Sequence, residues 1–335
     1  MVTKMPKALL NESTVEPTSS STQSRKPRNS GYKRQPYIKE AVTIAPTPPV
    51  EKVSTLTPED EALIQRTDFR ILELSRPFVR PSALSIPKHD VYGWPMDSAY
   101  TSILEARTSS FATRGTLPSI TDERVFEALS MGEFVIQLSL MFNPYVLGFR
   151  EQYPVVNDAA YQRAAEQGKR LPRSKLTTID LLVTHLIPGS LDIHFHMVNV
   201  KHASFEPTGK KLEADTRRQL KERRVADQSS WTWERLRSDS IPRQEVVNYA
   251  FLWSLTRTSK IRHLYDASSV LASQFRTHSV AGSLDETLKR RARSLNISLH
   301  EAYRLFASCV AYGFVTLDHT KPLDKHLPIP FLPTV

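Results

Sequence analysis

A succession of apolar segments between residues 130 and 237 restricts the folds that this chain can adopt. It begins at Ser130 and Glu133, a capping box of the kind that starts helices, directly before the apolar run FVIQLSLMF. Three strand-like runs follow, at 146–156, 176–186 and 191–203. A charged helical segment at about 210–224 then precedes a fourth strand-like run at 229–237. The order helix, three strands, helix, strand predicts an α/β domain.

A helix start at Thr57 and Pro58 marks the beginning of the folded sequence, because Thr caps helices, Pro fits the first turn and acidic residues follow. The preceding residues, 1–55, are rich in Ser, Thr and Pro and carry more basic than acidic side chains. This composition offers too little apolar surface to offset the entropy of ordering. We predict a disordered basic arm, which is either a spacer or a contact to DNA phosphates or a partner protein.

The pattern becomes helical after about residue 253, where the sequence predicts a domain boundary. Two capping boxes start helices there, Ser283 with Glu286 and Ser298 with Glu301. The second helix ends before Gly313, and a short strand-like run, FVTLD, follows. Helix, turn, helix and strand in this order predict a small winged helix-turn-helix domain at 254–335. Residues 56–253 then form the α/β domain.

Composition excludes several classes of function. The chain has 45 Lys and Arg residues against 35 Asp and Glu, so its surface should attract a polyanion such as nucleic acid. The single cysteine, Cys309, excludes an intramolecular disulfide and a multi-cysteine zinc site, as in cytosolic proteins. The sequence contains no long apolar run and neither of the common glycine-rich phosphate-binding loops. We expect a cytoplasmic, nucleoid-associated protein without a membrane partner.

Four polar residues in or beside the apolar segments indicate hydrolytic chemistry. Asp180 interrupts the apolar run TTIDLLV, where a carboxylate needs a partner. Asn199 and Lys201 stand two apart in HMVNVK, so both face one side of a strand, and a neighbouring strand can bring Asp180 to that side. Glu133 adds a carboxylate from the preceding helix. Mg²⁺-dependent phosphodiester hydrolysis uses such a set, because carboxylates hold the ion and a lysine orients water or stabilises charge.

Each of these residues also has a simpler interpretation. Asp180 can accept hydrogen bonds from a loop at a strand end. Glu133 occupies the position at which a capping box bonds the amide of its cap residue. Lys201 can be a surface lysine. The order and register of the set favour the active site over these separate roles.

Three histidines offer a different metal site. His194, His196 and His202 share the strand face opposite Asn199 and Lys201, and a His-x-His pair on a strand can bind zinc. The set lacks a clear third ligand from a carboxylate or a cysteine. We therefore favour packed or surface histidines.

The succession SMGEFVIQLSLMFNPYVLGFREQYPV, TTIDLLV and MVNVK, followed by a charged helix and a Trp-containing strand, resembles the TnsA-like endonuclease subunit of heteromeric bacterial transposases. The resemblance covers about 56–335 and excludes the basic arm. It implies a restriction-endonuclease-like core, a mixed sheet flanked by helices, followed by a winged helix. It also implies cleavage of the 5′, non-transferred strand at transposon ends during cut-and-paste transposition.

The resemblance assigns roles to individual residues. Glu133, Asp180 and Asn199 correspond to metal ligands, Val200 joins them as a metal-binding position, and Lys201 is the motif lysine. Asn199 departs from the Gln that the family generally carries, which leaves open whether one or two ions bind. The implied cofactor is Mg²⁺, with Mn²⁺ able to substitute. The implied partners are transposon-end DNA, a DDE-type transposase subunit, and an AAA+ ATPase regulator that docks on the winged helix.

Two other functions stay open at this point. A stand-alone nuclease of restriction or repair type would use the same core. A non-enzymatic DNA-binding adaptor would use only the winged helix and the arm.

Overall fold

The protein is described by a computed structural model that covers residues 56–332, with gaps at 67, 85, 97, 105, 107–112, 122, 156–165, 169–176, 259 and 279. The predicted basic arm at 1–55 lies outside the described residues.

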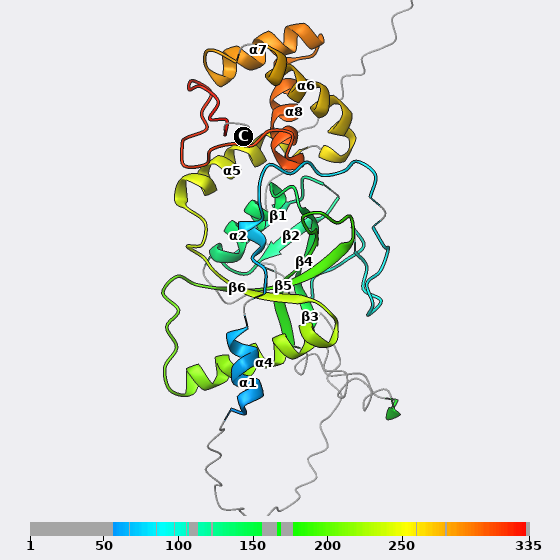
Figure 1. Ribbon diagram of the computed structural model, residues 1–335, viewed down its shortest axis with the longest axis vertical. Coiled ribbons are helices and arrows are strands. Elements are labelled where there is room, and N and C mark those ends of the chain that lie inside the picture. Colours follow the sequence, from blue (N-terminus) through cyan, green and yellow to red (C-terminus); the bar gives the residue numbers. More distant parts are fainter. Residues whose placement is uncertain are drawn as a thin grey trace, which may run out of the picture. The chain divides into compact units, whose positions relative to one another are not determined.

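A four-stranded mixed sheet lies at the centre of the α/β region, and Figure 1 shows its strands between the helices. The strands are β3 (Val146–Val155), β4 (Thr177–Leu186), β5 (Ile193–Lys201) and β6 (Thr232–Arg237), adjacent in that order. The first three pair antiparallel, whereas β6 runs parallel to β5. Parallel neighbours need a crossover connection, which α4 (Lys210–Gln228) supplies. The predicted α/β class, with a mixed sheet flanked by helices, is confirmed.

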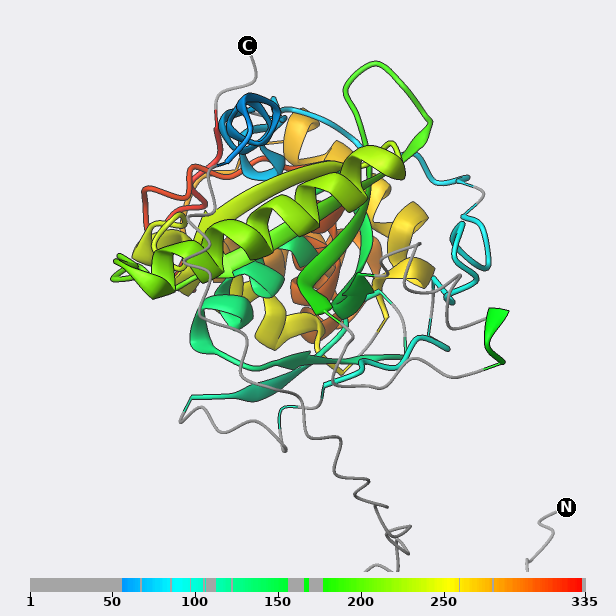
Figure 2. The same cartoon turned by 90° about the horizontal axis from the view of Figure 1, so that it is seen from below.

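The two faces of the sheet pack against different helices because successive side chains of a strand alternate between faces. Leu181 and Val198 lie in the same apolar cluster as helix α2 (Met131–Met141). Leu182 and Met197 belong to a second cluster, which includes α4 side chains. Figure 2 shows α4 running along the sheet. The sheet is therefore covered on both faces, and polar groups at its strand ends lie close to both helices.

Two short helices open the described part of the chain. Helix α1 (Pro58–Gln65) begins as predicted, with the Thr57 hydroxyl accepting a hydrogen bond from the Asp60 amide at 3.2 Å. The 3-10 helix η1 (Ile71–Glu73) follows it. Strands β1 (Gly115–Pro118) and β2 (Val125–Ala128) then form a small antiparallel sheet before α2. The sequence did not predict this sheet.

The C-terminal region is helical, as predicted. It contains α5 (Arg243–Thr256), η4 (Ile261–Leu264), α6 (Tyr265–Thr277), α7 (Leu284–Leu295) and α8 (Leu299–Tyr312). Ser283 and Glu286 form the predicted capping box of α7, and Ser298 caps α8. The predicted boundary at 253 falls within α5, and one apolar cluster includes side chains from α2, α5 and α8.

The strand predicted at 314–318 is wrong, because only Leu317 forms a bridge, to Phe331. Two backbone hydrogen bonds flank this bridge, from the Asp318 amide to Pro330 and from the Leu332 amide to Thr316. Pro330 has no amide hydrogen of its own, and proline interrupts the regular ladder that a longer strand would need. The region is helical with a minimal bridge, and its assignment as a winged helix stays a prediction.

Gly313 ends α8 in a conformation that only glycine adopts there without strain. Its φ is 78°, and a Cβ atom would lie 1.8 Å from the Phe78 carbonyl oxygen. The chain therefore turns directly against the segment that precedes the small sheet. Among the described helices, none is long and apolar enough to cross a membrane.

Candidate active site

Asp180 lies near the start of β4, next to the last cross-strand pair between Leu181 and Val198. Its Oδ2 accepts a hydrogen bond from the Val200 amide at 2.7 Å. Its Oδ1 lies 3.4 Å from the Arg218 guanidinium on α4. Burial raises the pKa of this carboxyl group above its ordinary value, while Arg218 and the Val200 amide oppose the rise. The carboxylate thus has partners on β5 and α4, not in a loop at the strand end.

Asn199 follows Val198 on β5 and is buried on the side of the sheet that α4 covers. Its Nδ2 donates to both carboxylate oxygens of Glu222, at 3.1 and 3.0 Å. Its Oδ1 is buried and finds no hydrogen-bond partner among the described residues. Because a buried carbonyl oxygen normally accepts a hydrogen bond, this orphaned atom is a candidate ligand.

Lys201 is two residues further along β5, and its ammonium group is held by a carboxylate. The Nζ atom lies 3.3 Å from Asp215 Oδ1 and 4.8 Å from the centre of the Phe205 ring. The second oxygen of Asp215 lies 2.9 Å from the Arg235 guanidinium. Lys201 also lowers the pKa of Asp180 through its charge. It is therefore not a free surface lysine, although it is not bonded directly to Asp180.

Glu133 lies in the first turn of α2 and is only 7% exposed. Its carboxylate accepts hydrogen bonds from the Leu129 amide, the Ser130 hydroxyl and the Gln152 amide group, each at 3.1 Å. Burial raises its pKa to about 7, and the charge of Asp180 contributes to the rise. The two carboxyl groups therefore interact electrostatically across the sheet edge.

The capping interaction at Glu133 differs from the predicted box. Ser130 Oγ accepts a hydrogen bond from the Glu133 amide at 3.2 Å, as a cap residue does. The carboxylate, however, accepts from Leu129, one residue before the cap. Gly132 allows this helix start to approach the sheet, because a Cβ atom there would lie 2.9 Å from Ser238 Cβ and 3.4 Å from Val200. Capping and a site role can therefore coexist at Glu133.

Gln152 on β3 connects Glu133 with β4. Its amide nitrogen donates to Glu133, and its oxygen accepts from the Thr178 hydroxyl at 3.2 Å. Its φ is 48°, which is unusual for a residue other than glycine inside a strand. Backbone strain of this kind tends to cluster at functional sites. In the sequence, Gln152 stands only within the strand-like run VLGFREQYPV, which predicts no role for it.

Helix α4 supplies three charged residues that sequence reasoning missed as site members: Asp215, Arg218 and Glu222. Their spacing of three and four residues places them on one helix face, which is the signal that could have found them. Glu222 is buried and accepts hydrogen bonds from Arg218 and from the Trp233 indole as well as from Asn199. Glu213, in the first turn of the same helix, is exposed.

The histidines form no metal site in the part of the chain that the structure describes. His196 is buried, with Nδ1 2.7 Å from the Thr232 hydroxyl and Nε2 3.0 Å from Glu234. His202 is exposed and bonds Ser204. Across the described ranges, no group of three His, Cys, Asp or Glu side chains could hold a metal ion. A metal site in this region would therefore need other oxygen donors.

Glu133, Asp180 and Asn199 are the oxygen donors of the predicted metal site, and their binding of one ion stays a prediction. Glu133 and Asp180 have raised pKa values, and Asn199 has a buried oxygen without a partner among the described residues. Mg²⁺ prefers such oxygen ligands, and a cation among them would offset the repulsion between the carboxylates. Val200, the remaining predicted metal-binding position, donates its amide hydrogen to Asp180, and its role at an ion stays a prediction.

Comparison of the sequence with models of known protein families finds no match, and comparison with curated proteins finds none either.

Proposed function

We propose that this chain is a Mg²⁺-dependent DNA endonuclease with a restriction-endonuclease-like core. The observation that supports it most directly is the interaction of Glu133 with Asp180, which helps to raise the Glu133 pKa to about 7, beside the orphaned Asn199 oxygen. Two buried carboxylates that interact are costly in a protein unless a cation or a proton compensates them. The net charge of +10 suits a DNA substrate.

Glu133, Asp180 and Asn199 would hold the ion, with Mn²⁺ as a possible substitute. Bound Mg²⁺ polarises a phosphate oxygen and lowers the pKa of its water. The Val200 amide keeps the Asp180 carboxylate oriented, and Gln152 does the same for Glu133. Arg218 balances charge at Asp180.

Lys201 orients the attacking water in this proposal. Its ammonium group is held by Asp215 at 3.3 Å, so it must rotate away or share its protons to reach a substrate phosphate. A lysine has three donors on a flexible stem, which permits both contacts. The Asp215 pairing holds the ammonium group in place until DNA arrives.

The resemblance of the sequence motifs favours a place within a transposase over a stand-alone nuclease. The chain would then cut the 5′, non-transferred strand at transposon ends, while a DDE-type subunit acts on the other strand. The C-terminal helices would form the winged-helix domain that docks an AAA+ regulator. Two alternatives are a nuclease of restriction or repair type and a non-enzymatic DNA-binding adaptor.

Strand cleavage by the full chain tests this proposal. Supercoiled plasmid carrying a transposon end is incubated with Mg²⁺, with and without the DDE-type subunit, and nicking is measured for the wild type, Asp180→Asn and Lys201→Ala. We expect both substitutions to reduce nicking at least about a hundredfold, in the range that follows loss of one electrostatic contact in a catalytic site. Asp227→Asn, on the exposed end of α4, is the control.

Calorimetric titration with Mn²⁺ distinguishes loss of metal binding from loss of strand cleavage. Asp180→Asn should lose the metal while Lys201→Ala retains it, because the lysine is not a ligand. Cleavage that both variants retain would contradict the proposed site. Absence of cleavage in every condition would leave the adaptor function.

A further inference from the structure

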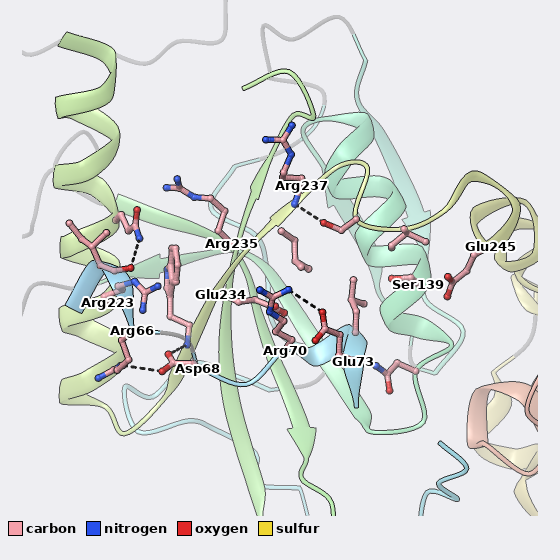
Figure 3. Close-up of a pocket in the computed structure, with 18 of the residues that line it drawn as sticks. Arg66, Asp68, Arg70, Glu73, Ser139, Arg223, Glu234, Arg235, Arg237 and Glu245 are labelled. Carbon is pink, nitrogen blue, oxygen red and sulfur yellow. Dashed lines mark hydrogen bonds and ion pairs between the residues drawn. The ribbon is translucent and has the colours of Figure 1, made fainter. Parts of the chain in front are cut away.

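A cavity of about 620 Å³ lies along β6, on the side away from β5 (Figure 3). Its wall comes from β6, from α4, from the segment between α1 and η1, and from the start of α5. Arginines dominate its charged lining: Arg66, Arg70, Arg76, Arg223, Arg235 and Arg237. Figure 3 draws Arg235 and Arg237 on β6 and Arg223 on α4.

The acidic residues of the wall are already engaged. Asp68 Oδ1 bonds Arg66 at 3.0 Å, and its Oδ2 accepts from the Trp233 amide at 2.7 Å. Glu234 Oε1 accepts from the Ile71 amide and lies 3.0 Å from His196. Glu73 bonds Arg70 at 3.0 Å, and Glu245 accepts from the Tyr249 hydroxyl at 2.8 Å. Four carboxylates therefore line the wall with six arginines, of which Arg66, Arg70, Arg235 and Arg237 are ion-paired.

Arg223 is the strongest indication of a missing ligand. It is only 5% exposed, and its Nε and Nη1 atoms find no hydrogen-bond partner in the described part of the chain. Its guanidinium lies over the Trp233 ring, 4.2 Å from the ring centre. Arg235 lies two residues after Trp233 on β6, and its buried Nε also finds no partner among the described residues. Buried guanidinium donors normally bond an oxygen, so this wall fits an anion.

The edge of β6 does not favour an added peptide strand. Strand addition uses a row of free backbone amides and carbonyls along an edge. Here the Trp233 amide donates to Asp68, and the Arg237 amide donates to the Ser240 hydroxyl at 3.0 Å. The side chains, not the backbone, are available at this edge.

We propose that the β6 cavity binds a phosphate ester, held by Arg223 and Arg235. Guanidinium groups bind phosphate through two parallel hydrogen bonds, and several arginines within one wall suit its multiple charge. The volume exceeds that of a lone phosphate and accommodates a nucleotide. The phosphate comes either from a free nucleotide or from a DNA strand.

The cavity also communicates with Lys201 through one shared carboxylate. Asp215 bonds Lys201 with one oxygen and Arg235 with the other. A phosphate that draws Arg235 away leaves Asp215 to Lys201 alone and strengthens that pair. Occupancy of the cavity therefore influences the lysine, a consequence that rests on the proposed function, whereas phosphate binding itself does not.

Binding is measured on the full chain without Mg²⁺, so that failure of the proposed nuclease leaves the result unaffected. The probes are inorganic phosphate, deoxyadenosine monophosphate and a 5′-phosphorylated oligothymidylate, with chloride at matched ionic strength as reference. Calorimetry and thermal unfolding compare the wild type with Arg223→Gln and Arg235→Gln. Arg224→Gln is the matched control, because Arg224 is an exposed neighbour on α4 that pairs with Asp60 outside the cavity.

We expect the mononucleotide to bind once per chain and both cavity variants to weaken it about tenfold or more, as loss of a charged hydrogen bond does. Arg224→Gln should bind as the wild type does. Binding of the oligonucleotide alone, lost in the same variants, assigns the site to a DNA strand, and nucleotide binding assigns it to a free ligand. Should Arg223→Gln not fold, Arg235→Gln decides.

Three results would overturn the proposal. They are no binding of any phosphate probe, binding that both cavity variants retain, and binding of a glutamate-rich peptide in place of the phosphate probes.

Discussion

The candidate active site and the β6 cavity contain opposite imbalances of charge. At the active site, burial and Asp180 raise the pKa of Glu133 to about 7, and the Asn199 oxygen lacks a partner among the described residues. In the cavity, burial lowers the pKa of Arg223, and Nε and Nη1 of its guanidinium lack partners there. One region would gain stability from a cation and the other from an anion.

Helix α4 explains how both regions form within a short distance. Each residue of a helix is rotated by about 100° from the one before it. Glu222 therefore faces Asn199, while the next residue, Arg223, faces the cavity. The difference between the regions comes from which face of one helix a residue occupies.

Removal of the Glu222 carboxylate should produce the largest loss of stability. In Glu222→Ala, Arg218, Asn199 and the Trp233 indole lose their common acceptor. Because the buried Asn199 and Trp233 donors would be left without an acceptor, we expect the free energy of unfolding to fall by about 1–3 kcal/mol for each of them. Urea unfolding monitored by circular dichroism measures this.

Asp227→Ala is the matched control on the same helix. Asp227 forms an exposed ion pair with Arg66, so its substitution should lower the free energy of unfolding by less than about 1 kcal/mol. Equal effects of the two substitutions would show that the Glu222 network does not stabilise the site.

Glu133→Gln should change the pH dependence of stability. The folded-state pKa of about 7 lies above the ordinary value of 4.5, so the native state holds its proton more tightly than the unfolded chain. The associated stability is full below about pH 4.5 and is lost as the pH rises through 7. The neutral Gln avoids this loss. With a chelator present, we expect the variant to be more stable by up to about 3 kcal/mol above pH 7.

Unfolding free energies of the wild type and the variant between pH 4 and 9 test this prediction. The two curves should converge at the acidic end. A constant difference at all pH values would mean that Glu133 titrates normally and that its carboxylate does not sense Asp180.

The sequence predicted the order of elements well because each has a local signal. Apolar, strand-like runs predicted β4 and β5, and the alternation of side chains along a strand placed Asn199 and Lys201 on one face. Asp180 and Asn199 consequently lie at neighbouring positions of adjacent strands, as the sequence analysis anticipated. Capping residues likewise predicted the starts of α2 and α7.

The partners of these residues depend on long-range packing and were not predicted. Lys201 bonds Asp215, and Asn199 bonds Glu222, across a crossover whose docking angle no local pattern specifies. Gln152 has a positive φ inside β3, where no local turn motif predicts one. The cavity combines segments more than a hundred residues apart, such as Arg66 and Arg223.

Asn199→Asp should expose the need for a cation at the active site. The new carboxylate would face Glu222, which now lies about 3 Å from the Asn199 amide nitrogen. In the presence of a chelator, we expect the free energy of unfolding of Asn199→Asp to be about 2 kcal/mol lower than that of the wild type, as for a buried polar group without a partner. Mg²⁺ should restore part of this loss, because binding to the native state stabilises it.

Asn248→Asp provides the control for this metal effect. Asn248 is buried on α5 and bonds Lys321 and Leu323, away from the proposed ligands. Thermal unfolding in chelator and in Mg²⁺ should show destabilisation without recovery. Recovery of both variants, or of neither, would argue against an ion at Asn199.

Arg223→Met tests the buried positive charge in the β6 cavity and should change the free energy of unfolding the least. Met retains apolar contact with Trp233 and removes a buried charge whose nearest opposite charge, Asp68, is already bonded to Arg66. Replacement of a buried ionic group by an apolar one is often stabilising, so we expect a gain of about 1 kcal/mol without phosphate. Exposed Arg224→Met should change stability by less than about 0.5 kcal/mol. Phosphate should then stabilise the wild type but not Arg223→Met, reversing their order. A loss of stability in Arg223→Met would mean that Asp68 already compensates the guanidinium and that the cavity has no need of an anion.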